Sequence, residues 1–294
     1  MFLVQSAKAQ TEADALAAIK LATNPSTKLA AAEDFVTKFP NSNARHDIAE
    51  LIAAEILKIK NGAVALALLE RAQAVFTSPE EREIFKPVAL TAYELANRPD
   101  DAFALADAML AKNPKDLAVL MQLTQLGTDE ARKRNRKYAD VSLQYGLKAI
   151  ALIEADNKTE NLGQLYQQTA ILNLAAGNTR EAKSRLEKAT TLSPQDPGNF
   201  ALLGRVINVD YLTQLSTYES MPDGKAKQDV AKQLNSILDT VIDNYAHAAG
   251  LAVGRAEYQT LLRQVLPDLT TYYKQRNDGS IKGLQQLIDR YKAR

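Results

Sequence analysis

The stretch that decides the fold is "AAGNTREAKSRLEKATTLSPQDP", which runs from Ala175 to Pro197. Its Gly177-Asn178 step suits a tight turn, because both residue types tolerate left-handed backbone conformations. The residues after this turn are strong helix formers, and Pro194 and Pro197 then end the helix. The stretch therefore predicts the end of one helix, a short turn and a second helix that packs back against the first.

Small residues recur at fixed distances in the predicted second helices. Ala182 and Ala189 are seven residues apart, and we place three corresponding pairs upstream, at Ala67/Ala74, Ala102/Met109 and Ser142/Ala149. The steps between the first members are 35, 40 and 40 residues. A period of this length indicates a solenoid, in which each helix pair buries its apolar face against the next pair. Short side chains suit such a stack because they let two helices cross closely.

This unit resembles the tetratricopeptide repeat, which places a small residue at each helix crossing and a proline at its end. In the best copy, residues 163–196, Tyr166 matches the first aromatic position and Ala170 takes the place of the crossing glycine. The family's first tryptophan is absent throughout. Weaker copies cover about 9–42, 48–81, 83–116 and 117–154, the last with an insertion.

The resemblance implies an all-α fold, a right-handed superhelix of antiparallel helix hairpins. We expect the repeats to occupy residues 10–196, followed without a break by a degenerate repeat and capping helices over residues 197–294. Within the second segment we predict a helix over 225–247 and a closing helix over 280–292 that begins at a serine cap. Upstream, we predict a helix cap at Ser78, and a chain break over 126–130 with Thr128 as the next cap.

The first nine residues, "MFLVQSAKA", leave two interpretations open. Ala7-Lys8-Ala9 has the small-x-small pattern of a signal-peptidase site, so residues 1–9 are either the remnant of an export signal or a frayed lead-in to the first helix. We favour an exported or periplasmic location over a cytoplasmic one. The segment "AEDFVTKFPNS" (Ala32–Ser42) is similar to repeats of bacterial envelope-assembly proteins, which agrees with export.

The composition excludes several function classes. Basic and acidic residues number 36 and 35, so no global field attracts nucleic acid, and we expect no nucleic-acid partner. No apolar run reaches the ~18 residues of a membrane span. The chain has no cysteine, which excludes disulfides, thiolate metal sites and a cysteine nucleophile.

The motifs of common enzymes are missing as well. The two histidines, His46 and His247, lie far apart in a chain whose repeats contact only their neighbours. The sequence contains no His-x-x-x-His pair, no phosphate-binding glycine loop and no dinucleotide fingerprint. We therefore expect no catalytic residues, no metal ion and no cofactor.

The candidate partner-binding residues lie on the predicted first helices of the later repeats, which should line the concave groove. They are polar and neutral or basic: Gln122, Gln125, Gln164, Gln167, Arg205 and Asn208. Apolar residues at corresponding positions of the predicted first helices can either contact a partner or pack on the next helix. We favour packing for Ile52, Ile56, Met121 and Ile171. The paired lysines and asparagines that clamp a peptide carboxylate in some relatives are missing here.

A second candidate site is the basic run "ARKRNRKY" (Ala131–Tyr138), which falls in the insertion. It contains Arg132, Lys133, Arg134, Arg136 and Lys137. Either it is a solvated helix turn, or it docks an acidic partner, a lipid headgroup or a polyanion.

The resemblance, rather than the composition, implies what the chain does. It implies a non-enzymatic scaffold that binds a protein or peptide partner in the concave groove. The first alternative is a small-molecule or oligomeric ligand bound in the same groove, and the second is an enzyme.

Overall fold

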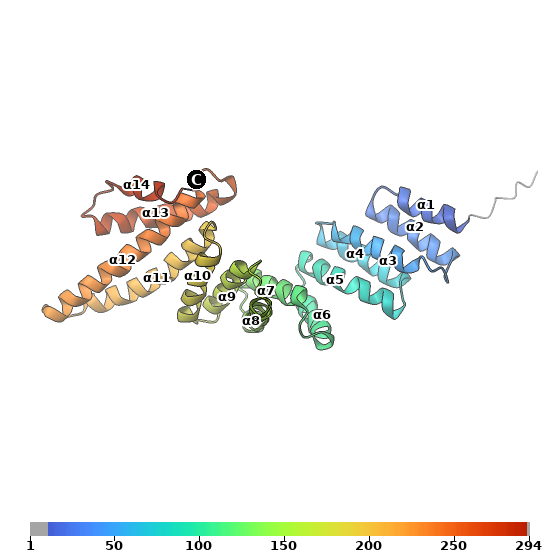
Figure 1. Ribbon diagram of the computed structural model, residues 1–294, viewed down its shortest axis with the longest axis horizontal. Helices are drawn as coiled ribbons and strands as arrows, with labels where there is room; N and C mark the ends of the chain where they lie inside the picture. The colour runs from blue at the N-terminus through green and yellow to red at the C-terminus, as the bar shows by residue number, and fades with distance from the viewer. Residues whose placement is uncertain (1–10, 293–294) are drawn as a thin grey trace, which may run out of the picture. The chain divides into compact units, whose positions relative to one another are not determined.

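The computed structural model describes residues 11–292, which form fourteen α-helices, one short 3-10 helix and no strand (Figure 1). The predicted all-α fold is therefore confirmed. The interpretation of residues 1–9 as a signal remnant lies outside the described residues. The chain divides into two compact units, one ending at Val119 and the other beginning at Leu120.

The first unit is built of three helix hairpins. They are α1 (Glu12–Leu21) with α2 (Pro25–Lys38), α3 (Arg45–Leu57) with α4 (Gly62–Val75), and α5 (Pro79–Leu95) with α6 (Pro99–Lys112). The helix α5 begins where the sequence predicts a start. Ser78 accepts from the Glu81 N–H at 3.2 Å while the Glu81 carboxylate accepts from the Ser78 N–H at 3.0 Å, and Pro79 follows. This capping box satisfies two backbone donors that helix formation leaves unpaired.

The second unit continues the hairpin pattern with longer helices toward its end. Its elements are α7 (Leu117–Arg132), which starts just before the unit boundary, α8 (Ala139–Ala155), α9 (Leu162–Ala175), α10 (Thr179–Leu192), α11 (Pro197–Glu219), α12 (Lys225–Ala252), η1 (Ala256–Tyr258), α13 (Gln259–Arg276) and α14 (Leu284–Asp289). No described helix is both long and apolar enough to cross a membrane.

Both predicted small-residue positions are fully buried in two of the four pairs, Ser142/Ala149 and Ala182/Ala189, whereas in the pair Ala102/Met109 Ala102 is fully buried and Met109 is half-buried. The first pair is wrong by two residues, because Ala67 and Ala74 are exposed whereas Ala65 and Ala72 are buried. The repeat is therefore real, but its register in α4 differs from the prediction.

The predicted break over 126–130 is also wrong, because α7 runs through it to Arg132. Thr128 is buried inside the helix, and its hydroxyl donates to the Thr124 carbonyl at 2.7 Å. A Cβ on Gly127 would stand 1.9 Å from Ser142 Oγ, so this glycine allows α7 and α8 to approach closely rather than ending a helix.

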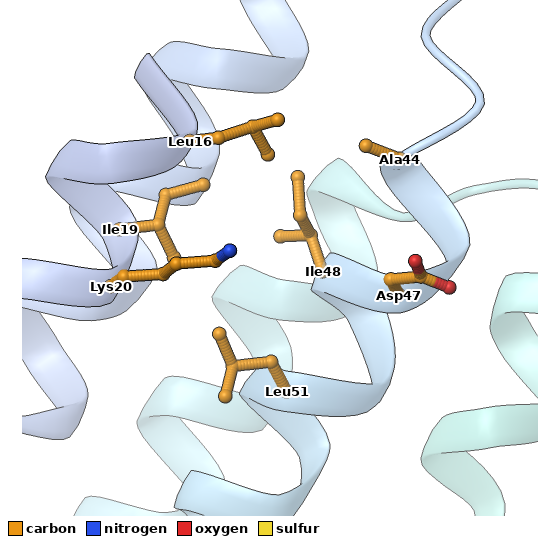
Figure 2. Close-up of a pocket in the computed structure, with 7 residues that line it drawn as sticks. All are labelled: Leu16, Ile19, Lys20, Ala44, Asp47, Ile48 and Leu51. Atoms are coloured by element: carbon orange, nitrogen blue, oxygen red, sulfur yellow. The ribbon is translucent and has the colours of Figure 1, made fainter. Parts of the chain in front are cut away.

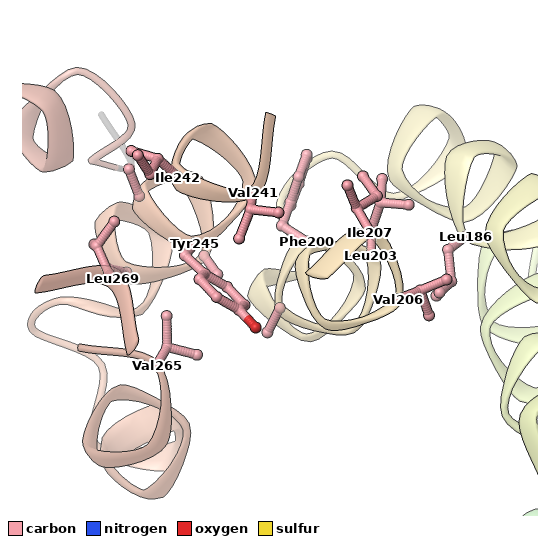
Figure 3. Close-up of a cluster of buried hydrophobic side chains, with 14 of the residues drawn as sticks. Leu186, Phe200, Leu203, Val206, Ile207, Val241, Ile242, Tyr245, Val265 and Leu269 are labelled. Carbon is pink, nitrogen blue, oxygen red and sulfur yellow. The ribbon is translucent and has the colours of Figure 1, made fainter. Parts of the chain in front are cut away.

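The core of the last three long helices is apolar and continuous (Figure 3). Figure 3 shows Tyr245 of α12 with its ring directed toward α11, which carries Leu203 and Ile207, while Val265 of α13 lies on the opposite side. Gly204 lets α11 and α12 approach, since a Cβ there would meet the Tyr245 ring at 2.7 Å. Burial, with the nearby Asp268 carboxylate, raises the pKa of Tyr245 to about 12, so its hydroxyl stays neutral.

The closing helix is shorter than predicted. It starts at Leu284 rather than at Ser280, and Gly283 before it has a left-handed φ of 93°. The end of the chain is held instead by a ring stack, in which His247 lies between Phe200 and Tyr291 with centroid separations of 3.6 and 4.1 Å. Burial lowers the pKa of His247 despite the nearby Asp243, which keeps the imidazole neutral within the stack.

Candidate partner-binding site

A hollow with an apolar floor opens between α1 and α3, the first helices of two successive hairpins. Its volume is about 170 Å³. Figure 2 shows Ile19 and Lys20 facing Ile48 and Leu51 across it, whereas the Asp47 carboxylate is directed away from α1. The α1 side contributes Leu16, Ile19 and Lys20, and the α3 side contributes Ala44, Asp47, Ile48 and Leu51. We call this feature the α1–α3 hollow.

Helical spacing places these side chains on facing surfaces. Leu16, Ile19 and Lys20 are three and four residues apart on α1, and Ala44, Ile48 and Leu51 repeat that spacing on α3. The start of α3 is fixed from both sides: Ser42 donates to the Glu12 carboxylate of α1 and accepts from the Ala44 N–H at 3.0 Å. The two walls of the hollow are thus tied together at one end.

A second contact fixes α3 from behind. The Arg45 guanidinium donates through Nε and Nη2 to the two carboxylate oxygens of Glu81, at 2.9 and 3.0 Å. Burial would raise the pKa of Glu81, but the Arg45 and Ser78 hydrogen bonds lower it below the usual range. The carboxylate therefore stays charged and holds α3 against α5.

The rim of the α1–α3 hollow carries one positive and one negative group. Lys20 of α1 and Asp47 of α3 are both exposed, and within residues 11–292 neither forms an ion pair. An apolar floor with two unpaired charges at its edge suits an amphipathic protein segment, since it offers apolar burial together with groups that set direction.

The residues predicted for the groove lie in the second unit, where several of them connect successive first helices. Gln168 of α9 donates to Gln125 of α7, and Gln167 of α9 donates to Asn199 of α11 at 2.6 Å. Arg205 of α11 donates to Gln264 of α13 at 2.9 Å. We call these three contacts the inter-helix bridges. Gln125, Gln167 and Arg205 thus already have partners within the protein, and their role in binding stays a prediction.

The other predicted groove residues differ among themselves. Gln164 is exposed on α9, whereas Gln122 and Asn208 are half-buried. The side-chain oxygen Oδ1 of Asn208 is buried and accepts no hydrogen bond from a described residue. Of the apolar residues in the same frame, Ile52 and Ile56 are 1% and 3% exposed, so they belong to the core as favoured above.

Replacing Gln167 with leucine tests what this residue does. Asn199 is fully buried, and its side-chain oxygen Oδ1 would lose the hydrogen bond that Gln167 donates. We therefore expect the unfolding free energy to fall by about 1–3 kcal/mol. Chemical denaturation measures it, with the exposed Gln164→Leu as the control. An unchanged stability in Gln167→Leu would contradict a structural role.

Sequence reasoning missed the α1–α3 hollow. The first hairpin is a degenerate copy of the repeat, so Leu16 and Lys20 have no place in the repeat frame. On α3 the repeat pattern predicts that Ile52 and Ile56 face the groove, whereas the hollow is lined about one turn earlier by Ile48 and Leu51. The signal available was the spacing of Leu16, Ile19 and Lys20 itself.

The described residues contain no group of three or more histidine, cysteine, aspartate or glutamate side chains arranged to hold a metal ion. Stacked helix hairpins, with small residues buried between them and Pro194 closing the clearest copy, define the class: this is an all-α helical-repeat protein.

Comparisons with known proteins find similar solved structures at low sequence identity. No family model and no curated protein matches the chain. Similar solved structures include pilF of Pseudomonas aeruginosa, at 15% identity and a TM-score of 0.43 over 82% of this chain and 95% of that one. A thermophilic TPR protein of Thermus thermophilus shows 16% identity and a TM-score of 0.46 over 76% and 99%. IFIT1, solved with Gppp-AAAA, shows 16% and 0.42 over 90% and 55%.

Proposed function

We propose that this chain is a non-enzymatic protein-interaction scaffold, and that an apolar side chain of its partner is anchored in the α1–α3 hollow. The observation that carries the proposal is the hollow itself, with its apolar floor and the unpaired charges of Lys20 and Asp47. A partner segment that fits has one large apolar residue, an acidic residue facing α1 and a basic residue facing α3.

The size of the hollow favours a side chain over a free ligand. Its volume of about 170 Å³ is close to the ~150 Å³ that accommodates a benzene ring. Pockets that bury a drug-sized ligand have roughly 300–1,000 Å³. A single leucine or phenylalanine side chain of a protein partner therefore matches the space better than a small molecule does.

A display experiment tests the proposal without a known partner. Random peptides shown on phage are selected on the whole protein and then compared on Leu51→Asp, which places a charge in the floor of the hollow. We expect the selected peptides to carry one apolar anchor flanked by opposite charges. They should lose about 10–100-fold in affinity for the variant, because burying one such side chain contributes about 1.5–3 kcal/mol.

The matched control is Leu57→Asp. It makes the same change on the same helix, at a residue that is 43% exposed and outside the hollow. Affinity for this variant should stay within about twofold, as for a neutral surface site. Selected peptides that bind Leu51→Asp and Leu57→Asp equally well would overturn the assignment of the hollow. Peptides that bind only after the chain is started at Thr11 would assign it to the protein's own first ten residues.

A further inference from the structure

The connection between α7 and α8, residues 133–138, gathers exposed cations in the second unit. Lys133, Arg134, Arg136 and Lys137 lie in it, and Arg132 stands directly before it as the last residue of α7. We call residues 132–137 the basic loop. It is separate from the α1–α3 hollow, so a role for the basic loop does not depend on the function proposed for that hollow.

One buried carboxylate fixes the shape of the basic loop. Glu130 is 5% exposed and accepts from Lys133 Nζ and from Asn135 Nδ2, each at 2.7 Å. The Asn135 N–H also donates to the Glu130 carbonyl at 2.9 Å, and the Arg134 N–H donates to the Ala131 carbonyl at 3.0 Å. These two backbone bonds form a Schellman motif, which ends α7 with a defined geometry.

Arg134 occupies the left-handed position of that motif, with φ of 68°. The other described non-glycine residues with positive φ are Asn97, Asn157, Asn161 and Asp278, all of the short polar types that tolerate this region. Glycine is the preferred residue here, and a long side chain costs stability. The fold therefore gains nothing from arginine at this position, and observed strain of this kind points toward a function for the side chain.

The charges of the basic loop divide into paired and unpaired groups. Arg132 forms an ion pair with Asp129 at 2.9 Å, and Lys133 forms one with Glu130. Arg134 and Arg136 form none with any residue in the described range. Two unpaired guanidinium groups, two residues apart, are thus presented on a loop of fixed conformation.

The chemistry of the loop favours carboxylates as its ligand. A guanidinium group offers a planar fork that matches a carboxylate with two parallel hydrogen bonds. Proteins that bind single-stranded nucleic acid stack its bases on exposed aromatic rings. Tyr138 is only 6% exposed, and Lys137 Nζ lies over its ring, 5.2 Å from the centroid. Two unpaired cations are also fewer than the roughly four to eight typical of anionic-lipid binding.

We propose that the basic loop docks an acidic segment of a protein partner, with Arg134 and Arg136 each binding one carboxylate. A fixed loop suits this role because the two forks are already oriented before the partner arrives. The contact lies on the surface, so it should depend strongly on salt.

Fluorescence anisotropy with a labelled octaglutamate peptide tests the proposal at low salt. The double variant Arg134→Gly/Arg136→Gln should bind about tenfold more weakly than the wild type. The control Lys225→Gln/Lys274→Gln removes the same charge from two exposed lysines of the same unit and should stay within about twofold. Equal weakening in both variants would overturn the proposal, as would tighter binding of a single-stranded RNA or of phosphatidylserine vesicles than of the peptide.

The single variant Arg134→Gly separates binding from folding. Glycine removes the backbone strain, so the melting temperature should rise by about 2 °C while peptide affinity falls. Arg134→Lys keeps the charge but not the fork and should fall between wild type and glycine. A lower melting temperature in Arg134→Gly would show that the arginine is retained for the fold and would overturn the argument from strain.

Discussion

Replacing Glu81 with alanine should cost about 3–5 kcal/mol of unfolding free energy, the usual cost of breaking a buried ion pair from one side. Glu81 is 4% exposed and accepts from Arg45 at 2.9 and 3.0 Å and from the Ser78 N–H at 3.0 Å. Its loss leaves the Arg45 guanidinium, itself only 18% exposed, without its carboxylate. Urea unfolding followed by circular dichroism measures the loss.

The pH dependence of stability gives an independent check on Glu81. The Arg45 and Ser78 hydrogen bonds outweigh burial and hold the pKa of Glu81 below its usual range. An unfolded glutamate has a pKa of about 4.3. The stabilisation is therefore fully present above about pH 4.3 and is lost as the pH falls through the lower folded-state pKa.

Glu81→Gln keeps the shape of the side chain and removes the charge. The stability difference between wild type and this variant should be constant from about pH 5 to 8 and should shrink below about pH 4.3. A difference that stays constant down to about pH 3 would contradict the ion-pair account. Because Arg45 lies beside Ala44 in the first turn of α3, Glu81→Ala should also weaken binding at the α1–α3 hollow.

Replacing Gly62 with alanine should destabilise the first unit by about 3 kcal/mol, the upper end for overpacking a buried site. A Cβ on Gly62 would stand 2.3 Å from the Ala96 nitrogen and 2.4 Å from the Leu95 carbonyl atoms. These are backbone atoms at the end of α5, so no side chain can rotate to relieve the overlap. The helices α4 and α5 would have to separate.

Thermal and urea unfolding of Gly62→Ala measure this effect. The matched control is Ala63→Leu, which adds a larger group one residue later at an exposed position and should cost less than about 0.5 kcal/mol. Equal stability of Gly62→Ala and wild type would mean that α4 and α5 do not approach each other as closely as described.

The repeat period was predictable from the sequence, because the spacing of Ala182 and Ala189 reflects a packing need that recurs along the chain. The register in α4 was not predictable. The segment "GAVALALLERAQAV" (Gly62–Val75) offers alanines at several alternative positions, and only tertiary packing selects Ala65 and Ala72 over Ala67 and Ala74. Gly127 was misread for a related reason, since a glycine looks the same whether it ends a helix or lets two helices touch.

The candidate site was less predictable than the fold. The repeat frame locates which helix face a residue occupies, but it does not reveal whether that residue already has a partner. Gln167 and Arg205 were predicted for the groove, and both donate hydrogen bonds to neighbouring helices. The α1–α3 hollow depends on the distance between two helices that a weak first repeat does not determine.

The inter-helix bridges have a mechanical consequence for the second unit. Each one joins a first helix only to the next, α7 to α9, α9 to α11 and α11 to α13. A pulling force applied at α13 would load the Arg205–Gln264 hydrogen bond first. It would then load Gln167–Asn199, and last Gln125–Gln168. The hairpins of the second unit should therefore separate one at a time under a pulling force, because each hairpin is held only by contacts with its neighbours.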